Sequence, residues 1–367
     1  MKNISNSRSI SCFRPIGSST AIGLSRRQFL PAALLTALGL ASWPSKTFAA
    51  SGPVKVRLGT LAPKGSSYYK HLQAMGEKWR AVPGGVALTI YPDGSMGGEA
   101  DMVRRMRLGQ LQAGLLTATG LSQIEPAAAG LQFLPMMLRT LDEVDYINQQ
   151  LQPLVQKRME EKGFVPLFWA DTGWVRFFSK QPVVRPADLK NIKMFAWAGN
   201  AAELDIYRSV GCTPVALETV DILPNLQTGL INGVPLPPSF ALAGQVDSAA
   251  PHMLDLAWAP LVGALVITKK TWDTIPAAAR ESVRKAALET GKLIKSDGRR
   301  ESVESVQAMQ TRGLTVHTLT PEIEAEWRTE AAKLYPQIRG VMVPPDIFDE
   351  VVKQLEIYRA AREGNKK

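Results

Sequence analysis

Short apolar segments alternate with amphipathic segments in the part of the chain that follows its N-terminal stretch. Residues 54–59 alternate between apolar and polar side chains, as a half-buried strand does. Residues 67–82 follow serines that can cap a helix. Residues 86–91 and 112–117 are again strand-like, and residues 99–108 between them are helical in pattern. This order predicts an α/β fold in which helices cover both faces of a sheet.

The middle of the chain continues the alternation. Residues 141–162 and 201–210 are predicted helices, and residues 164–170, 174–179 and 191–196 are predicted strands. Ligands of α/β sheets bind where the loops gather at the carboxyl ends of the strands. The loops that follow these strands are therefore the first places to look for a binding site.

The last third of the chain is mostly helical in composition. Residues 276–311 contain no proline after the first position and are rich in Ala, Glu, Lys, Arg and Gln, which predicts one helix longer than the usual globular range. The alternative is two helices broken near residues 296–298, because glycine disfavours a helix interior. Residues 321–362 are also predicted to be helical, with a break at 340–345.

The first 49 residues have the composition of an export signal. A basic, serine-rich stretch ends in Arg26-Arg27, an uncharged run covers residues 31–45, and Thr47-Phe48-Ala49 offers small residues for cleavage. The run is too short for a membrane-spanning helix, which needs about 20 apolar residues. Residues 1–49 are thus predicted to be a twin-arginine signal peptide, cleaved near Ala49 to leave a protein in the periplasm.

The distribution of charge and of apolar segments argues against a nucleic-acid partner and against a membrane-embedded segment. The net charge is +10, but the N-terminal 49 residues hold six basic and no acidic residue, which leaves +4 for the rest. This weakens a nucleic-acid role, which needs a clustered basic face on the folded domain. Residues 222–246 are uncharged but contain four prolines and three glycines, so they are not predicted to form a membrane-spanning helix. We expect no nucleic-acid partner and no membrane-embedded segment in the mature protein.

The residue types that carry catalysis or bind metals are scarce. Two cysteines and three widely separated histidines supply no short metal motif. The sequence has no phosphate loop, no GxGxxG, no HExxH and no GxSxG elbow. We therefore expect no cofactor, no metal and no enzymatic activity, although catalytic residues far apart in sequence would escape this search.

Aromatic side chains gather in the middle of the chain. Seven of them fall within 30 residues: Phe168, Trp169, Trp174, Phe177, Phe178, Phe195 and Trp197. Most are expected in the core, but Trp174 and Trp197 lie next to polar loops and are better candidates for a ligand cleft. Arg176 shares a strand face with Trp174 and Phe178. It is either a polar group placed in that cleft or a surface arginine.

Six motifs in a fixed order resemble the DctP-type solute-binding proteins of TRAP (tripartite ATP-independent periplasmic) transporters. They are Val56–Thr60 (VRLGT), Tyr91–Glu99 (YPDGSMGGE), Leu108–Leu111 (LGQL), Phe133–Met137 (FLPMM), Pro186–Lys193 (PADLKNIK) and Leu226–Gly233 (LQTGLING). Each motif is weak alone, and the set of six is fairly specific. The likeness runs from about residue 54 to residue 260.

The resemblance implies a two-lobed periplasmic binding protein of α/β class, with a long helix bridging both lobes. Such a protein closes on a small solute by a hinge motion and delivers it to small and large membrane permease subunits. The implied divisions are lobe I at residues 50–171 plus about 262–300, lobe II at 172–261 plus about 301–362, and hinges near 170–172 and 259–261.

The resemblance also shows where this chain departs from its family. The family holds a carboxylate with an arginine, which binds it through two parallel hydrogen bonds. In this chain Phe195 stands at that position and Trp197 replaces a proline. A second family arginine falls on Val175, with Arg176 next to it, and the family's asparagine falls in the segment that ends at Leu236.

Two ligand hypotheses follow. A buried carboxylate without a partner is very unfavourable, so replacement of the polar anchors predicts an apolar or aromatic ligand. The alternative is an ordinary organic acid bound through Arg176. A lipid-handling protein or exported enzyme on the same scaffold is a further alternative. The predicted ligand-binding residues are Trp174, Arg176, Phe195, Trp197, Leu236, Phe240, Tyr68 and Thr119.

Overall fold

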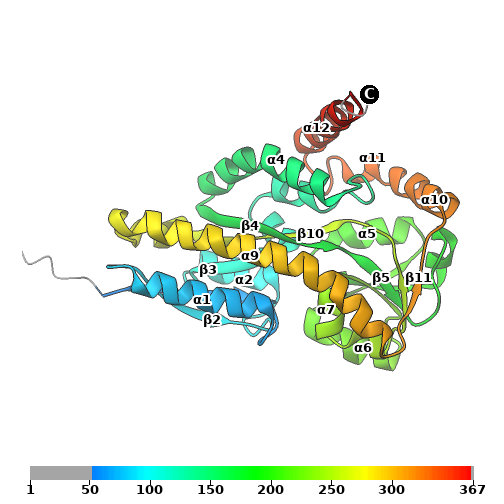
Figure 1. Ribbon diagram of the computed structural model, residues 1–367, viewed down its shortest axis with the longest axis horizontal. Coiled ribbons are helices and arrows are strands. Elements are labelled where there is room, and N and C mark those ends of the chain that lie inside the picture. Colours follow the sequence, from blue (N-terminus) through cyan, green and yellow to red (C-terminus); the bar gives the residue numbers. More distant parts are fainter. Residues whose placement is uncertain (1–51, 365–367) are drawn as a thin grey trace, which may run out of the picture. The chain divides into compact units, whose positions relative to one another are not determined.

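A computed structural model describes residues 52–364. The predicted signal peptide and its cleavage site lie outside these residues. The predicted α/β class is confirmed, and the strands form two sheets with helices on both faces (Figure 1).

The first sheet has five strands in the order β2-β1-β3-β10-β4. Their bounds are β1 Val54–Thr60, β2 Val86–Tyr91, β3 Ala113–Thr117, β4 Phe164–Trp174 and β10 Pro260–Thr268. The first three strands run parallel, and β10 pairs antiparallel with both β3 and β4. β10 is almost entirely apolar and buried, as expected for an interior strand covered on both faces.

Helices cover both faces of the first sheet. One face packs against α1 (Ser67–Ala81), α8 (Lys269–Thr274) and the first part of α9 (Ala277–Gln310). The other packs against α2 (Glu99–Arg107), α3 (Ala118–Ser122), the short helix Pro126–Leu131 and α4 (Leu141–Glu161). Of the two serines that could cap α1, Ser66 and Ser67, Ser66 does so: its hydroxyl accepts from the Tyr69 N–H.

The second sheet has six strands in the order β11-β9-β5-β8-β6-β7. Their bounds are β5 Arg176–Ser179, β6 Lys193–Trp197, β7 Thr213–Leu217, β8 Gly233–Leu236, β9 His252–Leu254 and β11 Thr315–His317. Helices α6 (Ile222–Thr228) and α7 (Pro238–Ala243) pack on one face. Helices α5 (Ala201–Ser209) and α10 (Pro321–Ala332) pack on the other.

Two neighbouring strands carry the chain between the sheets. β4 of the first sheet ends at Trp174, and β5 of the second begins at Arg176, so Val175 is the junction. The returning chain enters β10 at Pro260, which pairs with Trp174, and the Val175 N–H donates to the Ala259 carbonyl at 2.8 Å. The predicted hinge at 259–261 lies at this crossing. The predicted hinge at 170–172 ends three residues before Val175.

Helix α9 is a single unbroken helix of 34 residues, so the alternative of two helices is wrong. At 1.5 Å per residue it is about 50 Å long. It packs on α1 and β4 beside the first sheet and on α7 beside the second (Figure 1). Gly291 and Gly298 lie where neighbouring groups leave no room for a side chain. A β-carbon at Gly291 would lie 2.6 Å from Phe168, and one at Gly298 would collide with the Tyr68 hydroxyl.

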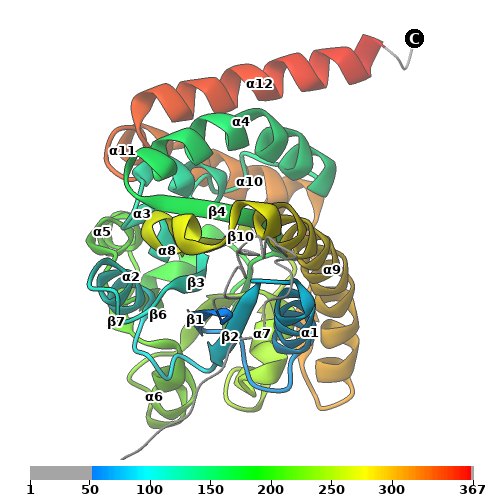
Figure 2. The same cartoon turned by 90° about the vertical axis from the view of Figure 1, so that its left-hand side faces the viewer.

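The C-terminal part of the chain returns to the first sheet. After α10, the short helix α11 (Tyr335–Ile338) leads into α12 (Pro345–Gly364). α12 lies along α4, and its buried residues join the same core as those of α4 (Figure 2). This differs from the predicted assignment of residues 301–362 to lobe II, because α12 buries its apolar face against helices of the first lobe.

Candidate functional site

Two cavities lie between the sheets, where the strands of each sheet end. Cavity 1 is lined from the second sheet by Trp197 at the end of β6 and Leu236 at the end of β8. The first sheet contributes Leu261 of β10, and the junction contributes Val175. Its remaining walls are mainly apolar, with Phe133, Ile206, Trp258 and Met342 among them.

Cavity 2 lies beside it and shares Leu261. It is formed by the carboxyl ends of β1 and β3, by the end of β4 and by α7. The Tyr68 and Phe240 rings, 5.8 Å apart, close it from the two sides. Hydroxyl groups of Tyr68 and Thr172 are buried there, and neither has a hydrogen-bond partner within the described residues.

Four of the predicted site residues line these cavities. Trp197 and Leu236 line cavity 1, and Tyr68 and Phe240 line cavity 2. Phe195 is fully buried in the core beneath them, with its ring edge-on to Trp197 at 5.3 Å. It can support the wall of cavity 1 but is not among the residues that line it.

The other predicted residues lie elsewhere. Thr119 is buried in α3, and its hydroxyl has no partner, but it lines neither cavity. Trp174 and Arg176 line a separate groove against α9. The Arg176 Nε forms an ion pair with Asp255 at 3.0 Å. Val175 points into cavity 1 while Arg176 faces the opposite way, because successive strand residues alternate. The structure therefore does not place Arg176 as a carboxylate anchor in either cavity.

Glu203 is a cavity residue that the sequence analysis missed. It lies in the first turn of α5, is 8% exposed and lines cavity 1. Burial raises its pKa to about 8, although the Trp197 N–H and the Tyr207 side chain act in the opposite direction. A glutamate in the first turn of a helix is ordinarily read as a helix-stabilising residue, so the sequence pattern gave no reason to assign it to a cleft.

Glu99 organises the first-sheet side of cavity 2. Its carboxylate accepts hydrogen bonds from the Thr117 N–H and hydroxyl, both at 2.6 Å, and from the Gly120 N–H at 2.8 Å. Burial nevertheless raises its pKa. The side chain thus ties the first turn of α2 to the end of β3 and the start of α3, and all three elements position the cavity wall.

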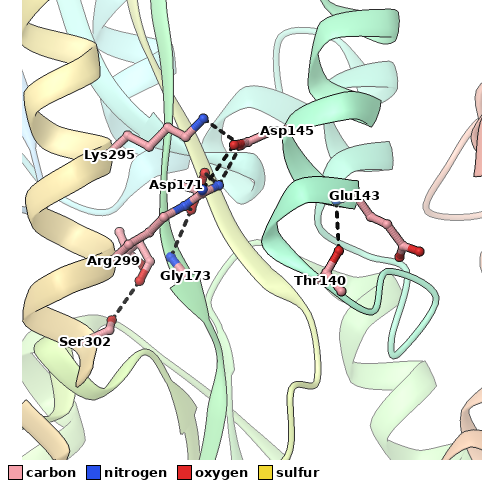
Figure 3. A network of polar contacts seen from close by, with 9 residues as sticks. Thr140, Glu143, Asp145, Asp171, Gly173, Lys295, Arg299 and Ser302 are labelled. Carbon is pink, nitrogen blue, oxygen red and sulfur yellow. Dashed lines mark hydrogen bonds and ion pairs between the residues drawn. The ribbon is translucent and has the colours of Figure 1, made fainter. Parts of the chain in front are cut away.

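An ion-pair network fixes α9 to the end of β4 (Figure 3). The Arg299 guanidinium donates to both carboxylate oxygens of Asp171 at 2.7–2.8 Å and to both of Asp145 at 2.7–3.2 Å. Lys295 also pairs with Asp145 at 2.6 Å. The Ser302 hydroxyl donates to the Thr172 carbonyl at 2.7 Å. Although burial opposes it, hydrogen bonds from Arg299 and Lys295 lower the pKa of Asp145.

All the acidic or basic residues that line the two cavities are Asp or Glu. Glu203 lines cavity 1, and Glu99 and Asp171 line cavity 2. Within residues 52–364, no lysine, arginine or histidine is among the lining residues of either cavity. In the same part of the chain, no group of three or more His, Cys, Asp or Glu residues is arranged to hold a metal ion.

Two sheets joined by a pair of crossing strands and a shared helix, with cavities between them, define the class of two-lobed solute-binding proteins. Residues 58–340 match the bacterial extracellular solute-binding proteins of family 7, the DctP family. The chain belongs to this family. The resemblance inferred from the six motifs is confirmed.

Relatives and solved structures agree with this assignment. The C4-dicarboxylate-binding periplasmic protein DctP of Rhodobacter capsulatus is 25% identical over 72% of this chain and 79% of its own length. A TRAP periplasmic solute-binding protein from Shewanella oneidensis, solved with succinate, has a TM-score of 0.76 at 19% identity and covers 82% of this chain and 99% of its own. A Bordetella pertussis receptor binding pyroglutamic acid has a TM-score of 0.74 at 16% identity, with coverages of 82% and 98%.

The family is one of extracellular solute receptors, which is consistent with the predicted periplasmic location. No helix between residues 52 and 364 combines the length and the apolar character needed to cross a bilayer.

Proposed function

We propose that this chain is the periplasmic solute-binding subunit of a TRAP-type transporter. It binds a small solute between the two sheets and delivers it to small and large membrane permease subunits. The observation that carries the proposal is the pair of cavities formed jointly by both sheets in a member of this family. Export by the twin-arginine pathway, cleavage near Ala49 and the absence of enzymatic activity belong to the same proposal.

The relatives favour an organic acid as the solute. The Rhodobacter, Shewanella and Bordetella proteins are named for, or solved with, C4-dicarboxylates, succinate and pyroglutamic acid. Because Arg176 faces away, a carboxylate in this chain would be held by neutral donors. The unpartnered hydroxyls of Tyr68 and Thr172 in cavity 2 are the donors that the structure offers. Hydrogen bonds to a charged group contribute about 1.5–3 kcal/mol each.

An apolar or aromatic solute is the second candidate, and a specific observation favours it. Val175, at the position of one family arginine, lines cavity 1, and so does Leu236, which ends the segment where the family's asparagine falls. Phe195, at the position of the other family arginine, is buried in the core beside Leu236 and Trp197. The relatives do not support this candidate, because the ligands in their names are acids.

Closure is proposed to occur about the junction at Val175 and Pro260, where the two crossing strands pair. The lobes are those predicted from the sequence, residues 50–171 with about 262–300 and residues 172–261 with about 301–362, except that α12 packs with the first.

The test is a thermal-shift and calorimetry screen of the mature protein. Succinate and pyroglutamate represent the acids, and phenol and indole represent neutral aromatic solutes. Saturation with a true ligand at 100 times Kd raises the free energy of unfolding by about 2.7 kcal/mol. Tyr68→Phe is expected to weaken binding of an acid roughly tenfold, since one charge-assisted hydrogen bond is lost. The matched control is Tyr69→Phe, which changes the neighbouring ring outside the cavities.

Each outcome decides between the candidates. Binding of acids with loss on Tyr68→Phe supports the first, and binding of neutral aromatics alone, with loss on Trp197→Ala, supports the second. Chemical conversion of a bound compound would contradict a receptor role and favour an enzyme on the same scaffold. Binding of neither acids nor neutral aromatics would contradict a small-solute receptor of either kind.

A further inference from the structure

The carboxyl group of Glu203 is buried and incompletely satisfied. The residue is 8% exposed, and its Oε2 atom has no hydrogen-bond partner. It lines cavity 1 together with Tyr207, which lies one turn further along α5. The side chain is not needed to cap α5, because the Asn200 side chain accepts from the Glu203 N–H and performs that role.

An acceptor of this kind is unfavourable in an empty apolar site. Leaving a buried acceptor without a donor is destabilising, and more so if the acceptor is charged. Among residues 52–364, no group supplies the missing donor and no basic side chain lines the cavity. The hydrogen-bond donor to the Glu203 Oε2 atom must therefore come from the solute or from solvent.

The walls around Glu203 favour a cationic group. Trp197 and Trp258 both line cavity 1. Faces of tryptophan rings attract cations, and the attraction grows when water is excluded. A carboxylate combined with tryptophan walls is suited to a protonated nitrogen and unsuited to a second anion.

We propose that the solute carries a protonated nitrogen, which binds the Glu203 carboxylate in cavity 1, a cavity also lined by Trp197 and Trp258. This inference rests on the proposed receptor function and narrows its ligand class. An organic acid that also carries an amine fits both the proposed acid class and the proposed nitrogen. Its nitrogen would bind Glu203, and its carboxylate would accept hydrogen bonds from the neutral donors Tyr68 and Thr172 of the adjoining cavity 2.

A competing arrangement keeps Glu203 protonated as a neutral donor to the solute's carboxylate. The raised pKa of Glu203 is compatible with this form in the empty site. The two arrangements differ in what Glu203→Gln does. A glutamine amide can still donate to a carboxylate, but it cannot neutralise a cation.

The test uses two matched triads of probes on the mature protein. One is phenylalanine, 3-phenylpropionate and phenethylamine, and the other is proline, cyclopentanecarboxylate and pyrrolidine. In each triad the second member lacks the nitrogen and the third lacks the carboxylate. We expect nitrogen-bearing members to bind at least tenfold more tightly than the nitrogen-free acid, and Glu203→Gln to remove that difference.

The matched control is Asp205→Asn on the same helix, whose carboxylate is exposed and paired with Arg208. It is expected to leave all affinities unchanged. The midpoint of thermal unfolding of each empty variant reports that it is folded. Calorimetry near pH 6.5 in buffers of different ionisation enthalpy gives a second readout: binding of a cation releases a proton from Glu203, whereas binding of a carboxylate by the neutral acid does not.

The inference would be overturned if the nitrogen-free acids bound as tightly as the nitrogen-bearing members, or if the nitrogen-bearing members kept their advantage in Glu203→Gln. So would succinate or pyroglutamate binding while no member of either triad binds, and the receptor function would then stand. If neither the triads nor the acids nor the neutral aromatics bind, the receptor function itself fails.

Discussion

Arg299 forms an ion pair with the buried carboxylate of Asp171, near the end of β4 where the chain passes from the first sheet to the second. Asp171 is 2% exposed, and both of its oxygens accept from Arg299. Removing one partner of a buried ion pair leaves an uncompensated charge, which typically destabilises a protein by 3–5 kcal/mol. We expect Arg299→Gln to lower the free energy of unfolding by about 3 kcal/mol, measured by urea denaturation.

Arg300 provides the matched control on the next position of α9. Its side chain is 59% exposed, and its ion pairs within the described part of the chain are with neighbours on its own helix, Asp297 and Glu304. Exposed pairs of this kind contribute about 0–1 kcal/mol. If Arg300→Gln lowered the free energy of unfolding as much as Arg299→Gln, the Arg299–Asp171 ion pair would contribute no more to stability than an exposed pair.

The sequence allowed only part of the site to be predicted. Trp197 and Leu236 line cavity 1 as expected, since they end strands of a sheet whose carboxyl ends face the cleft. Glu203 was missed because its position in the chain resembles that of an ordinary first-turn acid. Arg176 could not be placed because its partner Asp255 is 79 residues away in sequence, and only folding brings the two together.

At the scale of single elements, α9 depends on glycines that a helix would normally avoid. Replacing glycine by alanine in a helix interior ordinarily stabilises it by about 0.5–1 kcal/mol. At Gly291 the new β-carbon would lie 2.6 Å from the Cβ and Cγ atoms of Phe168 on β4. We expect Gly291→Ala to destabilise the protein by about 1–3 kcal/mol instead, because overpacking forces the helix and the strand apart.

Ser296→Ala on the exposed face of the same helix is the control for propensity alone. Thermal unfolding should show no loss of stability for this variant, because alanine is the better helix former. A Gly291→Ala protein as stable as the wild type would mean that β4 and α9 tolerate more separation than their packing suggests.

Most elements could be predicted from local patterns, and their arrangement could not. The strands at 54–59 and 86–91 and the helices at 67–82, 99–108 and 141–162 agree with the structure to within a residue or two. The insertion of β10 between β3 and β4, and the return of α12 to α4, depend on contacts between distant residues. Apolar periodicity shows which face is buried but not which element covers it.

On the scale of the whole described chain, the two sheets are joined closely enough to unfold together. Two paired strands cross between them, and α9 belongs to the cores of both through Ala287 and Met309. We expect one cooperative transition in urea, with the same midpoint for tryptophan fluorescence and far-UV circular dichroism. Arg299→Gln should shift both midpoints together, whereas two separable transitions would show that each sheet folds independently.

The position of β10 also determines when the first sheet can be completed during synthesis. This strand occupies the interior of the first sheet, yet it is made after nearly all of the second. Until residue 268 has left the ribosome, β3 and β4 each have an open edge and no partner on that side. Contacts this distant in sequence form slowly, and unpaired edges are where chains aggregate. The two sheets are therefore completed only after most of the chain has been made, and shielding of the open edges until then would protect the nascent chain from aggregation.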